Sequence, residues 1–357
     1  MYDIVIIGAG PSGSMLAKLI GERYKVLIID KRDFLDTGNN KINKCCGGLL
    51  APDAQNIIAK LGLGIPKEIL VDPQLFAVRT IDMNNNIERL YQRFYFNMNR
   101  EKFDKWLVSM IPKDVNKQFN SVFKGFKKNT EGYIVKYVKD GKTVEVKSKV
   151  LIGADGANSK VRRMSFPKKV SPKTYISIQE WYEATDYMPY FTAIFDEDLS
   201  DFYSWIIPKN NSILLGGAFN VGNQSIEKFE KLKKKLSDRG FSFGNKIKTE
   251  GAYIYRPVNT RQLFTGEGNI ALIGEASGAI SPSSAEGFSY GLKSALYLSQ
   301  SLNQGIHGFN TRYSHKMKSL KLNVFLKNLK SPAMYNPFLR KLAMKSGLQS
   351  IHYDKND

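Results

Sequence analysis

Short apolar runs along the chain each lead into a glycine turn and then into a helical pattern. The first run, Ile4 to Ile7, leads into Gly8, Gly10 and Gly13, and a helical pattern follows at once. The same order returns at residues 150–163 and at residues 269–295. Strands that alternate with helices across tight turns are typical of βα units, so the pattern predicts an α/β fold.

Two other regions alternate apolar and polar positions with the period of a strand. Residues 123–150 read as three short strands joined at N-T-E-G (129–132) and at D-G (140–141), which predicts a β-meander. Residues 174–219 hold several β-rich segments, and K-N-N-S at 209–212 predicts a hairpin turn. Many aromatic residues fall in this second region, and they could line an apolar ligand site.

The C-terminal part of the chain mixes basic and apolar residues. No acidic residue lies between Glu286 and Asp354, and the pattern predicts basic amphipathic helices broken at Pro332 and Pro337. Such helices can form a layer that packs on the core, can lie on an anionic membrane, or can bind nucleic acid. Nucleic acid is the least favoured of the three, because no recognised binding motif accompanies the charge. The basic residues are Arg312, Lys316, Lys318, Lys321, Lys327, Lys330, Arg340, Lys341 and Lys345.

Composition limits the class of protein. The 357 residues, 42% of them hydrophobic, suffice for two modest domains or for one large domain with an insertion, and the formal net charge is +20. Two cysteines and three scattered histidines form neither a disulfide framework nor a metal cluster, which fits a reducing cytoplasm. We find no signal-peptide pattern and no apolar run of about 18 residues, so we expect a cytoplasmic protein that does not span a membrane.

The first glycine turn carries a dinucleotide-binding pattern. Gly8 allows the tight turn, Gly10 lets a pyrophosphate approach the backbone, and Gly13 lets the helix pack on the strand. Asp30 ends the next apolar run, V-L-I-I-D, where a carboxylate can bind ribose hydroxyls. The pattern predicts a bound dinucleotide and leaves NAD and FAD open.

The other two turns supply further candidates. In the second, Gly153 ends a strand and Asp155-Gly156 turns into a helix that Asn158 or Ser159 could cap. In the third, Gly274 and Glu275 follow a strand at Ile270 to Ile273, and a helix begins near Gly287 with its N-terminus free to face an anion.

The chain's only two cysteines, Cys45 and Cys46, stand side by side before two glycines. Adjacent Cα atoms lie about 3.8 Å apart, below the usual disulfide range. We therefore expect two free thiols.

The order of these motifs resembles the FAD-dependent group that contains para-hydroxybenzoate hydroxylase, the flavin halogenases and the geranylgeranyl reductases. Three stretches are similar to geranylgeranyl reductases or to the group as a whole: N-R-E-K-F-D-K-W-L (99–107), K-C-C-G-G-L (44–49) and Y-S-W-I-I-P (203–208). The runs C-G-G-L-L-A-P-D-A-Q, V-D-P-Q-L-F-A-V-R-T-I-D and Y-Q-R-F-Y-F-N-M-N-R are similar to the CbrA family, a branch of those reductases. The resemblance extends to about residue 350.

This resemblance implies a doubly wound, Rossmann-like FAD-binding domain with an inserted β-sheet substrate domain and a helical C-terminus. The FAD-binding domain would comprise residues 1–75, 97–165 and 255–305, the substrate domain residues 76–96 and 166–254, and the basic helical region residues 306–357.

The resemblance also assigns residues. FAD would be held by Gly8, Gly10, Gly13, Asp30, Arg100, Asp155, Gly156, Gly274, Glu275 and Gly287, although the group more often has aspartate at the position of Glu275. Tyr203 and Trp205 would face the substrate. Cys46 aligns with the reductases' cysteine near the flavin, whereas Cys45 has no assigned role.

The implied activity is reduction of carbon-carbon double bonds in a prenyl-like lipid, with hydride from reduced FAD and a proton from Cys46. A flavin monooxygenase or halogenase acting on a small molecule is the alternative, and an oxidisable thiol beside the flavin argues against it. A non-catalytic flavoprotein that docks on membranes is a second alternative. We expect a lipid or other small-molecule substrate. An anionic membrane surface is a candidate partner, with peripheral attachment on the inner face of the membrane. The electron donor would be NAD(P)H, a ferredoxin or a flavodoxin.

Overall fold

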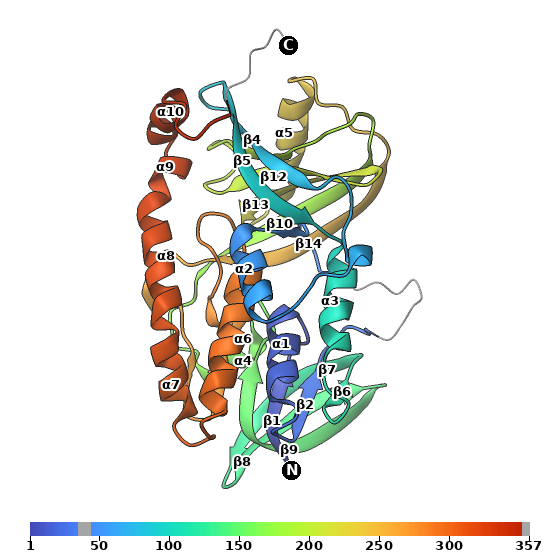
Figure 1. Cartoon of the computed structure of the whole chain (residues 1–357), viewed down its shortest axis with the longest axis vertical. Helices are drawn as coiled ribbons and strands as arrows, with labels where there is room; N and C mark the ends of the chain where they lie inside the picture. The colour runs from blue at the N-terminus through green and yellow to red at the C-terminus, as the bar shows by residue number, and fades with distance from the viewer. Residues whose placement is uncertain (35–43, 352–357) are drawn as a thin grey trace.

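The structure is a computed structural model that describes residues 1–34 and 44–351, and it contains two eight-stranded sheets (Figure 1). In the first sheet, β1, β2, β6, β9 and β16 run parallel to their neighbours, in the order β16-β9-β1-β2-β6. The strands β2 and β16, most of β1 and the last part of β9 are buried, as strands covered on both faces must be. Their bounds are Tyr2–Ile7 (β1), Val26–Ile29 (β2), Asn116–Gln118 (β6), Lys142–Gly153 (β9) and Ile270–Leu272 (β16).

Antiparallel strands extend this sheet. The β-meander expected from the alternating pattern is present, with turns at the predicted positions, and its last strand is β9 of the parallel core. A short strand pairs with β16 at the opposite edge. The added strands are Ser121–Asn129 (β7), Gly132–Lys139 (β8) and Gly266–Glu267 (β15).

The second sheet is antiparallel except where β11 pairs with β4. Its strand order is β14-β10-β13-β12-β11-β4-β5-β3, and β12 and β13 form the predicted hairpin at 209–212. The strand β3 directly follows the cysteine-glycine loop, so this loop connects to both halves of the molecule. The strands are Leu49–Leu50 (β3), Leu75–Asp82 (β4), Ile87–Asn97 (β5), Lys173–Glu183 (β10), Phe191–Phe195 (β11), Tyr203–Lys209 (β12), Ser212–Asn220 (β13) and Lys246–Arg256 (β14).

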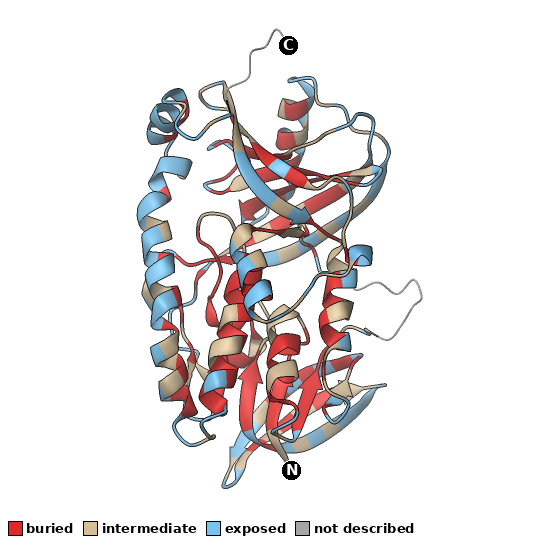
Figure 2. Cartoon of the chain, viewed as in Figure 1, coloured by how far each residue is buried: buried red, intermediate tan, exposed pale blue. Residues whose placement is uncertain are grey.

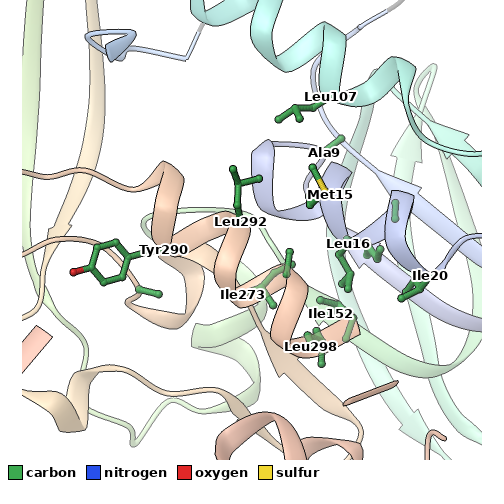
Figure 3. Packing of buried hydrophobic residues seen from close by; sticks show 14 of the residues in the cluster. Ala9, Met15, Leu16, Ile20, Leu107, Ile152, Ile273, Tyr290, Leu292 and Leu298 are labelled. Atoms are coloured by element: carbon green, nitrogen blue, oxygen red, sulfur yellow. The ribbon is translucent and has the colours of Figure 1, made fainter. Parts of the chain in front are cut away.

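Helices cover the faces of both sheets. A hydrophobic core joins α1, α3 and α6 to the strands β1, β2 and β9, and Figure 3 shows Met15, Leu16, Ile152 and Leu298 within it. The helix α5 covers the second sheet with Phe229, Leu232 and Leu236. The helices outside the C-terminal region are Pro11–Ile20 (α1), Pro52–Lys60 (α2), Arg100–Ser109 (α3), Lys160–Ser165 (α4), Ser225–Ser237 (α5) and Phe288–Leu302 (α6).

The C-terminal helices form a column along one side of the molecule (Figure 1). As the sequence predicts, new helices begin at Pro332 and Pro337. The last helix, α10, is fastened to β4 by a buried ion pair in which Arg340 Nε lies 2.9 Å from Asp82 Oδ2. The four helices are Phe309–Lys316 (α7), Lys318–Lys330 (α8), Pro332–Tyr335 (α9) and Pro337–Lys345 (α10).

The fold class is the predicted one: a doubly wound parallel sheet of the FAD-binding type, a second sheet and a helical C-terminus. The division of the chain into the three domains given above stays a prediction. No helix within the described ranges 1–34 and 44–351 has the length and apolarity needed to cross a bilayer.

Candidate functional site

One cavity of about 840 Å³ is lined by residues from both sheets and from the C-terminal helices. It brings together most of the residues that the sequence singled out, from three glycine turns, the cysteine loop and the β12 strand. These are Gly10, Cys46, Arg100, Gly156, Tyr203, Trp205, Glu275 and Gly287. The remaining candidates do not line the cavity but lie in the segments that form its wall. They are Gly8, Gly13, Asp30, Asp155 and Gly274.

The first glycine turn leaves room for a ligand at one position only. A Cβ at Gly13 would lie 1.9 Å from the carbonyl oxygen of Gly8, and a Cβ at Gly8, where φ is +105°, would lie 2.4 Å from that of Ala154. At Gly10 the nearest atom is a guanidinium nitrogen of Arg32 at 3.8 Å, and the residue opens on the cavity. The helix α1 begins here without a side-chain cap, so its first amides are available to an anion. This geometry fits a pyrophosphate.

Asp30 begins a chain of alternating charges. One of its carboxylate oxygens accepts from the backbone amide of Ala9 at 2.6 Å and the other from that of Arg32 at 2.8 Å. Arg32 donates in turn to Asp104 at 2.7 Å, and Asp104 also accepts from Arg100 Nε at 2.7 Å. Asp30 is thus held at the end of β2, beside the glycine turn where a ribose would lie.

Asp104 is a residue that the sequence analysis missed. It is buried, and although burial alone would raise its pKa, the charges of Arg100 and Arg32 lower it below the ordinary value. Burial opposes the charge of Arg100, but Asp104 and the sulfur of Cys46 raise the pKa of this guanidinium above its usual range. Arg100 therefore stays charged at the cavity wall. The signal was present in the sequence, because positions four apart on a helix share one face.

Asp155 and Gly156 differ in what they contact. The carboxylate of Asp155 accepts from the backbone amides of Lys160 at 2.7 Å and Val161 at 3.1 Å, so it holds the start of α4. Ser159, one of the two expected caps, accepts from the amide of Arg162. Gly156 lines the cavity, whereas the Asp155 carboxylate is occupied by the helix. Burial raises the pKa of Asp155.

The third turn places Gly274 against α1 and Glu275 at the cavity. A Cβ at Gly274 would lie 2.3 Å from Ser12 Oγ, so this glycine permits the close contact of the turn with α1. One carboxylate oxygen of Glu275 accepts from the amide of Tyr255 at 2.9 Å, and the other lies 3.7 Å from Lys44 Nζ. Gly287, which has no side chain of its own to cap the helix, stands at the start of α6 and lines the same cavity.

The two cysteines have different surroundings. Both are free thiols, as expected from their adjacency. Cys45 is buried with its sulfur 3.6 Å from Ser177 Oγ, and burial raises its pKa to about 12. Both cysteines line the large cavity. Cys46 is less buried, also lines a neighbouring cavity of about 350 Å³, and its sulfur accepts from the amide of Gly48 at 3.4 Å. A ligand in the cavity can therefore reach Cys46.

Lys209, at the end of β12, is a second residue that the sequence analysis missed. Its ammonium is buried and donates to the carbonyl oxygens of Gly48 and Met98, each at 3.0 Å, and to the side-chain oxygen of Asn97. Burial lowers its pKa to about 7. Gly48 has φ of +61°, and a Cβ there would lie 2.8 Å from Lys209 Nζ, so the glycine makes room for the lysine. Lys209 thus fixes the loop that carries Cys46.

The substrate side of the cavity is an aromatic and aliphatic wall. The hydroxyl of Tyr203 donates to the carbonyl of Ser284 at 2.8 Å, and its ring lies 5.5 Å from that of Trp205. Phe191, Phe195 and Ile207 add apolar surface. Within the described part of the chain, the indole nitrogen of Trp205 and the side-chain oxygen of Gln179 are buried without a hydrogen-bond partner, and both residues line the cavity.

Glu286 is a third residue that the sequence analysis did not assign. It lines the cavity, and its carboxyl group accepts from the backbone amide of Ser289 at 2.7 Å and from the hydroxyl of that serine. Burial raises its pKa above the ordinary value of a glutamate. A carboxyl group at the start of α6 fits the capping pattern of helix N-termini.

Comparison with known proteins gives relatives over nearly the whole chain. No family model matches. Protein CbrA of Escherichia coli O157:H7 is 38% identical over 350 residues, which is 98% of this chain and 98% of that protein.

Among solved structures, the chain is similar to two flavoproteins. A geranylgeranyl bacteriochlorophyll reductase-like protein of Thermoplasma acidophilum has a TM-score of 0.80 at 18% identity, covering 97% of this chain and 90% of that one. PqsL of Pseudomonas aeruginosa, described as a probable FAD-dependent monooxygenase, has a TM-score of 0.69 at 16% identity and covers 97% of this chain and 99% of that one. At these identities the likeness concerns the fold.

Proposed function

Because the chain belongs to the CbrA family and has the fold of FAD-dependent enzymes, we propose that it is an FAD-dependent oxidoreductase that reduces carbon-carbon double bonds of a prenyl-like lipid. One observation carries the proposal: the reachable thiol of Cys46 and the apolar wall of Tyr203 and Trp205 line the same cavity as the dinucleotide-type glycine turns. The cavity is large and most of its lining surface is apolar, as in sites for extended organic ligands.

The three turns would bind FAD. The open space at Gly10 and the free amides of α1 suit the pyrophosphate, and Asp30 suits the ribose. Arg100 adds a fixed positive charge at the wall, and Gly156 and Glu275 line the cavity beyond the pyrophosphate position. The start of α6 at Gly287 would direct its dipole to an anionic part of the ligand. Reduced FAD, when bound, supplies a hydride.

Cys46 would supply the proton that complements the hydride. Saturation of a double bond requires a hydride on one carbon and a proton on its neighbour. Both cysteines line the cavity, but Cys46 is only partly buried, whereas Cys45 is buried against Ser177 and burial raises its pKa to about 12. The buried Lys209 keeps the Cys46 loop in place through Gly48 and Met98.

A monooxygenase acting on a small molecule is the second candidate. The unpaired indole nitrogen of Trp205 and the unpaired oxygen of Gln179 favour it, because buried polar atoms at a cavity wall suit a substrate with polar groups. PqsL supports it through its fold. The thiol of Cys46, which lines the cavity, argues against it, since a thiol beside an oxygen-activating cofactor is readily oxidised.

The experiment that separates the candidates starts from the purified protein, reduced anaerobically by light. We expect rapid reoxidation on mixing with geranylgeranyl diphosphate and slow reoxidation on mixing with oxygen. Fast reaction with oxygen and inertness toward the prenyl compound would favour the monooxygenase, and inertness toward both would indicate a non-catalytic flavoprotein.

A further inference from the structure

The helix α8 carries an apolar stripe that faces outward. Leu322, Phe325, Leu326 and Leu329 are 58%, 49%, 46% and 63% exposed. They stand at i, i+3, i+4 and i+7, the spacing that normally faces a protein core. The core contact of α8 is made instead by Leu320 and Val324, which are buried. This helix therefore has two apolar faces, and only one of them is covered.

The same surface continues over the last two helices. Met334, Phe338, Leu339 and Leu342 are all exposed, and Phe338 is 66% exposed. The inner side of α10 is fixed by Arg340, through its ion pair with Asp82, so the exposed residues are held outward. Figure 2 shows the exposed outer sides of α8 and α10 along one side of the molecule. We call the eight residues from Leu322 to Leu342 named here the apolar surface.

The charge around the apolar surface has one sign. Residues 287–351 contain no aspartate or glutamate. Lys318, Lys321, Lys330, Lys341 and Lys345 are interspersed with the apolar residues on α8 and α10. This combination is complementary to an anionic bilayer. The apolar side chains can enter the boundary of the acyl chains, and the lysines can contact the anionic headgroups.

We propose that α8–α10 dock on the surface of an anionic lipid bilayer. Nucleic acid fits less well, because its phosphates would contact the lysines and leave the apolar residues in water. A second copy of the chain fits less well too, because each copy carries the same net charge of +20. A membrane takes both the apolar residues and the charge.

The cavity opens at this surface. Leu326 and Met334 belong to the apolar surface and also line the cavity, together with Lys327, Lys330 and Met344. A lipid chain could therefore pass from the bilayer along α8 and α9 toward Cys46 without crossing water. This route rests on the function proposed above, whereas the docking itself does not.

Vesicle sedimentation tests the docking with the full chain. We expect the protein to pellet with vesicles of phosphatidylglycerol and phosphatidylcholine, to stay in solution with pure phosphatidylcholine, and to be released by salt. The double variant Leu329→Ser, Phe338→Ser should weaken binding at least about tenfold, since each side chain contributes apolar burial. Neither residue lines the cavity. The matched control is Ile226→Ser, which is 70% exposed on α5 and should bind like the wild type.

Charge reversal gives a second arm. Lys318→Glu, Lys321→Glu should abolish binding at moderate salt, whereas the same reversal at the exposed Lys231 and Lys234 of α5 should leave most of it. Equal loss in the two pairs, equal binding to both kinds of vesicle, or binding to duplex DNA without binding to vesicles would overturn the docking.

Reduction of detergent-dispersed prenyl lipid by the same variants separates the docking from the proposed function. Lost vesicle binding with intact reduction in detergent supports the docking. Reduction without any vesicle binding by the wild type overturns the docking and leaves the proposed function standing. Vesicle binding without reduction overturns the proposed function, together with the route into the cavity that rests on it, and leaves the docking standing.

Discussion

Both cysteines line the cavity, but Cys45 is buried against Ser177 of β10, whereas the neighbouring Cys46 is only partly buried. We expect Cys46→Ser to lower the rate of double-bond reduction at least about tenfold, because a general acid typically contributes about 10²–10⁴ in rate and serine retains only part of it. Cys45→Ser should leave the rate within about twofold, since a buried thiol with a pKa of about 12 is a weak acid that stays protonated near neutral pH. Single-turnover reoxidation of the two variants measures this. Equal and small effects of the two substitutions on the rate would show that both cysteines serve only in packing.

Lys209 is the second residue with a distinct expectation. Its pKa is lowered to about 7 by burial, below the ordinary value of 10.5, so the unfolded chain binds more protons between pH 7 and pH 10.5. The contribution of Lys209 to the free energy of unfolding should therefore become more favourable as pH rises through that window, by at most about 1.4 kcal/mol per pH unit. Chemical denaturation of the wild type and of Lys209→Met at pH 7, 8 and 9 measures this. A difference between them that stays constant with pH would contradict the burial of the ammonium.

At this scale the sequence predicted residues of the glycine turns and the cysteine loop that the structure brings to one cavity, but not how they are held. Cys46, Gly10 and Glu275 were found because each stands in a local pattern. Lys209 and Glu286 were missed because no local pattern marks them. Lys209 contacts Gly48, which is 161 positions away, and the sequence of a strand does not show whether its lysine is buried. Asp104 could have been found from its spacing to Arg100.

At the scale of the element, the turn before α1 allows a matched pair of variants. Gly10→Ala should fold normally, because its Cβ would meet only a guanidinium nitrogen at 3.8 Å, but should bind FAD at least about tenfold more weakly, because the methyl group would occupy the position of the pyrophosphate. Thermal unfolding of the apoprotein and titration with FAD measure the two effects separately.

Gly13→Ala is the control for this turn. Its Cβ would lie 1.9 Å from a carbonyl oxygen within the turn, so the apoprotein itself should lose stability. Unchanged FAD affinity in Gly10→Ala would show that the turn is structural and binds no pyrophosphate.

A buried ion pair contributes to the attachment of α10. Asp82 is buried, and although burial alone would raise its pKa, hydrogen bonds from Arg340 and Asn85 lower it. Its contribution to stability is therefore complete above the unfolded pKa of about 3.9 and is lost as pH falls below that value toward the folded pKa. Asp82→Asn should cost about 3–5 kcal/mol, because it leaves the guanidinium of Arg340 buried without its partner.

Denaturation from pH 7 down to pH 3 checks this expectation, and the variant should show a weaker dependence on pH than the wild type. The matched control is Glu88→Gln, which breaks the pair of Glu88 with Arg79 at the surface and should cost less than about 1 kcal/mol. Equal costs for the two variants would contradict the role given to the buried pair.

At the scale of the whole molecule, the alternating and glycine-punctuated patterns predicted the βα units, the meander, the β12–β13 hairpin and the breaks at Pro332 and Pro337. These features are local, because turn chemistry and strand period are written in adjacent residues. The order of the second sheet was not predicted. It joins β3, β4 and β5 to strands more than a hundred residues later, and no local pattern specifies such pairings.

Local sequence patterns also could not predict that one apolar face of α8 points outward. The sequence left core packing and membrane contact open for the C-terminal helices, and the structure shows that α8 has an apolar residue set for each side. The count of apolar residues could not decide the matter, because burial depends on which face meets the rest of the protein.

The central claim is that bound, reduced FAD saturates a double bond in a lipid held against Cys46. The most direct test is the mass of the product after one anaerobic turnover of the photoreduced protein with geranylgeranyl diphosphate. The account predicts a product heavier than the substrate by two hydrogen atoms, formed much more slowly by Cys46→Ser and at the wild-type rate by Cys45→Ser. Unchanged substrate after anaerobic turnover, with a product heavier by one oxygen atom once air is admitted, would contradict it.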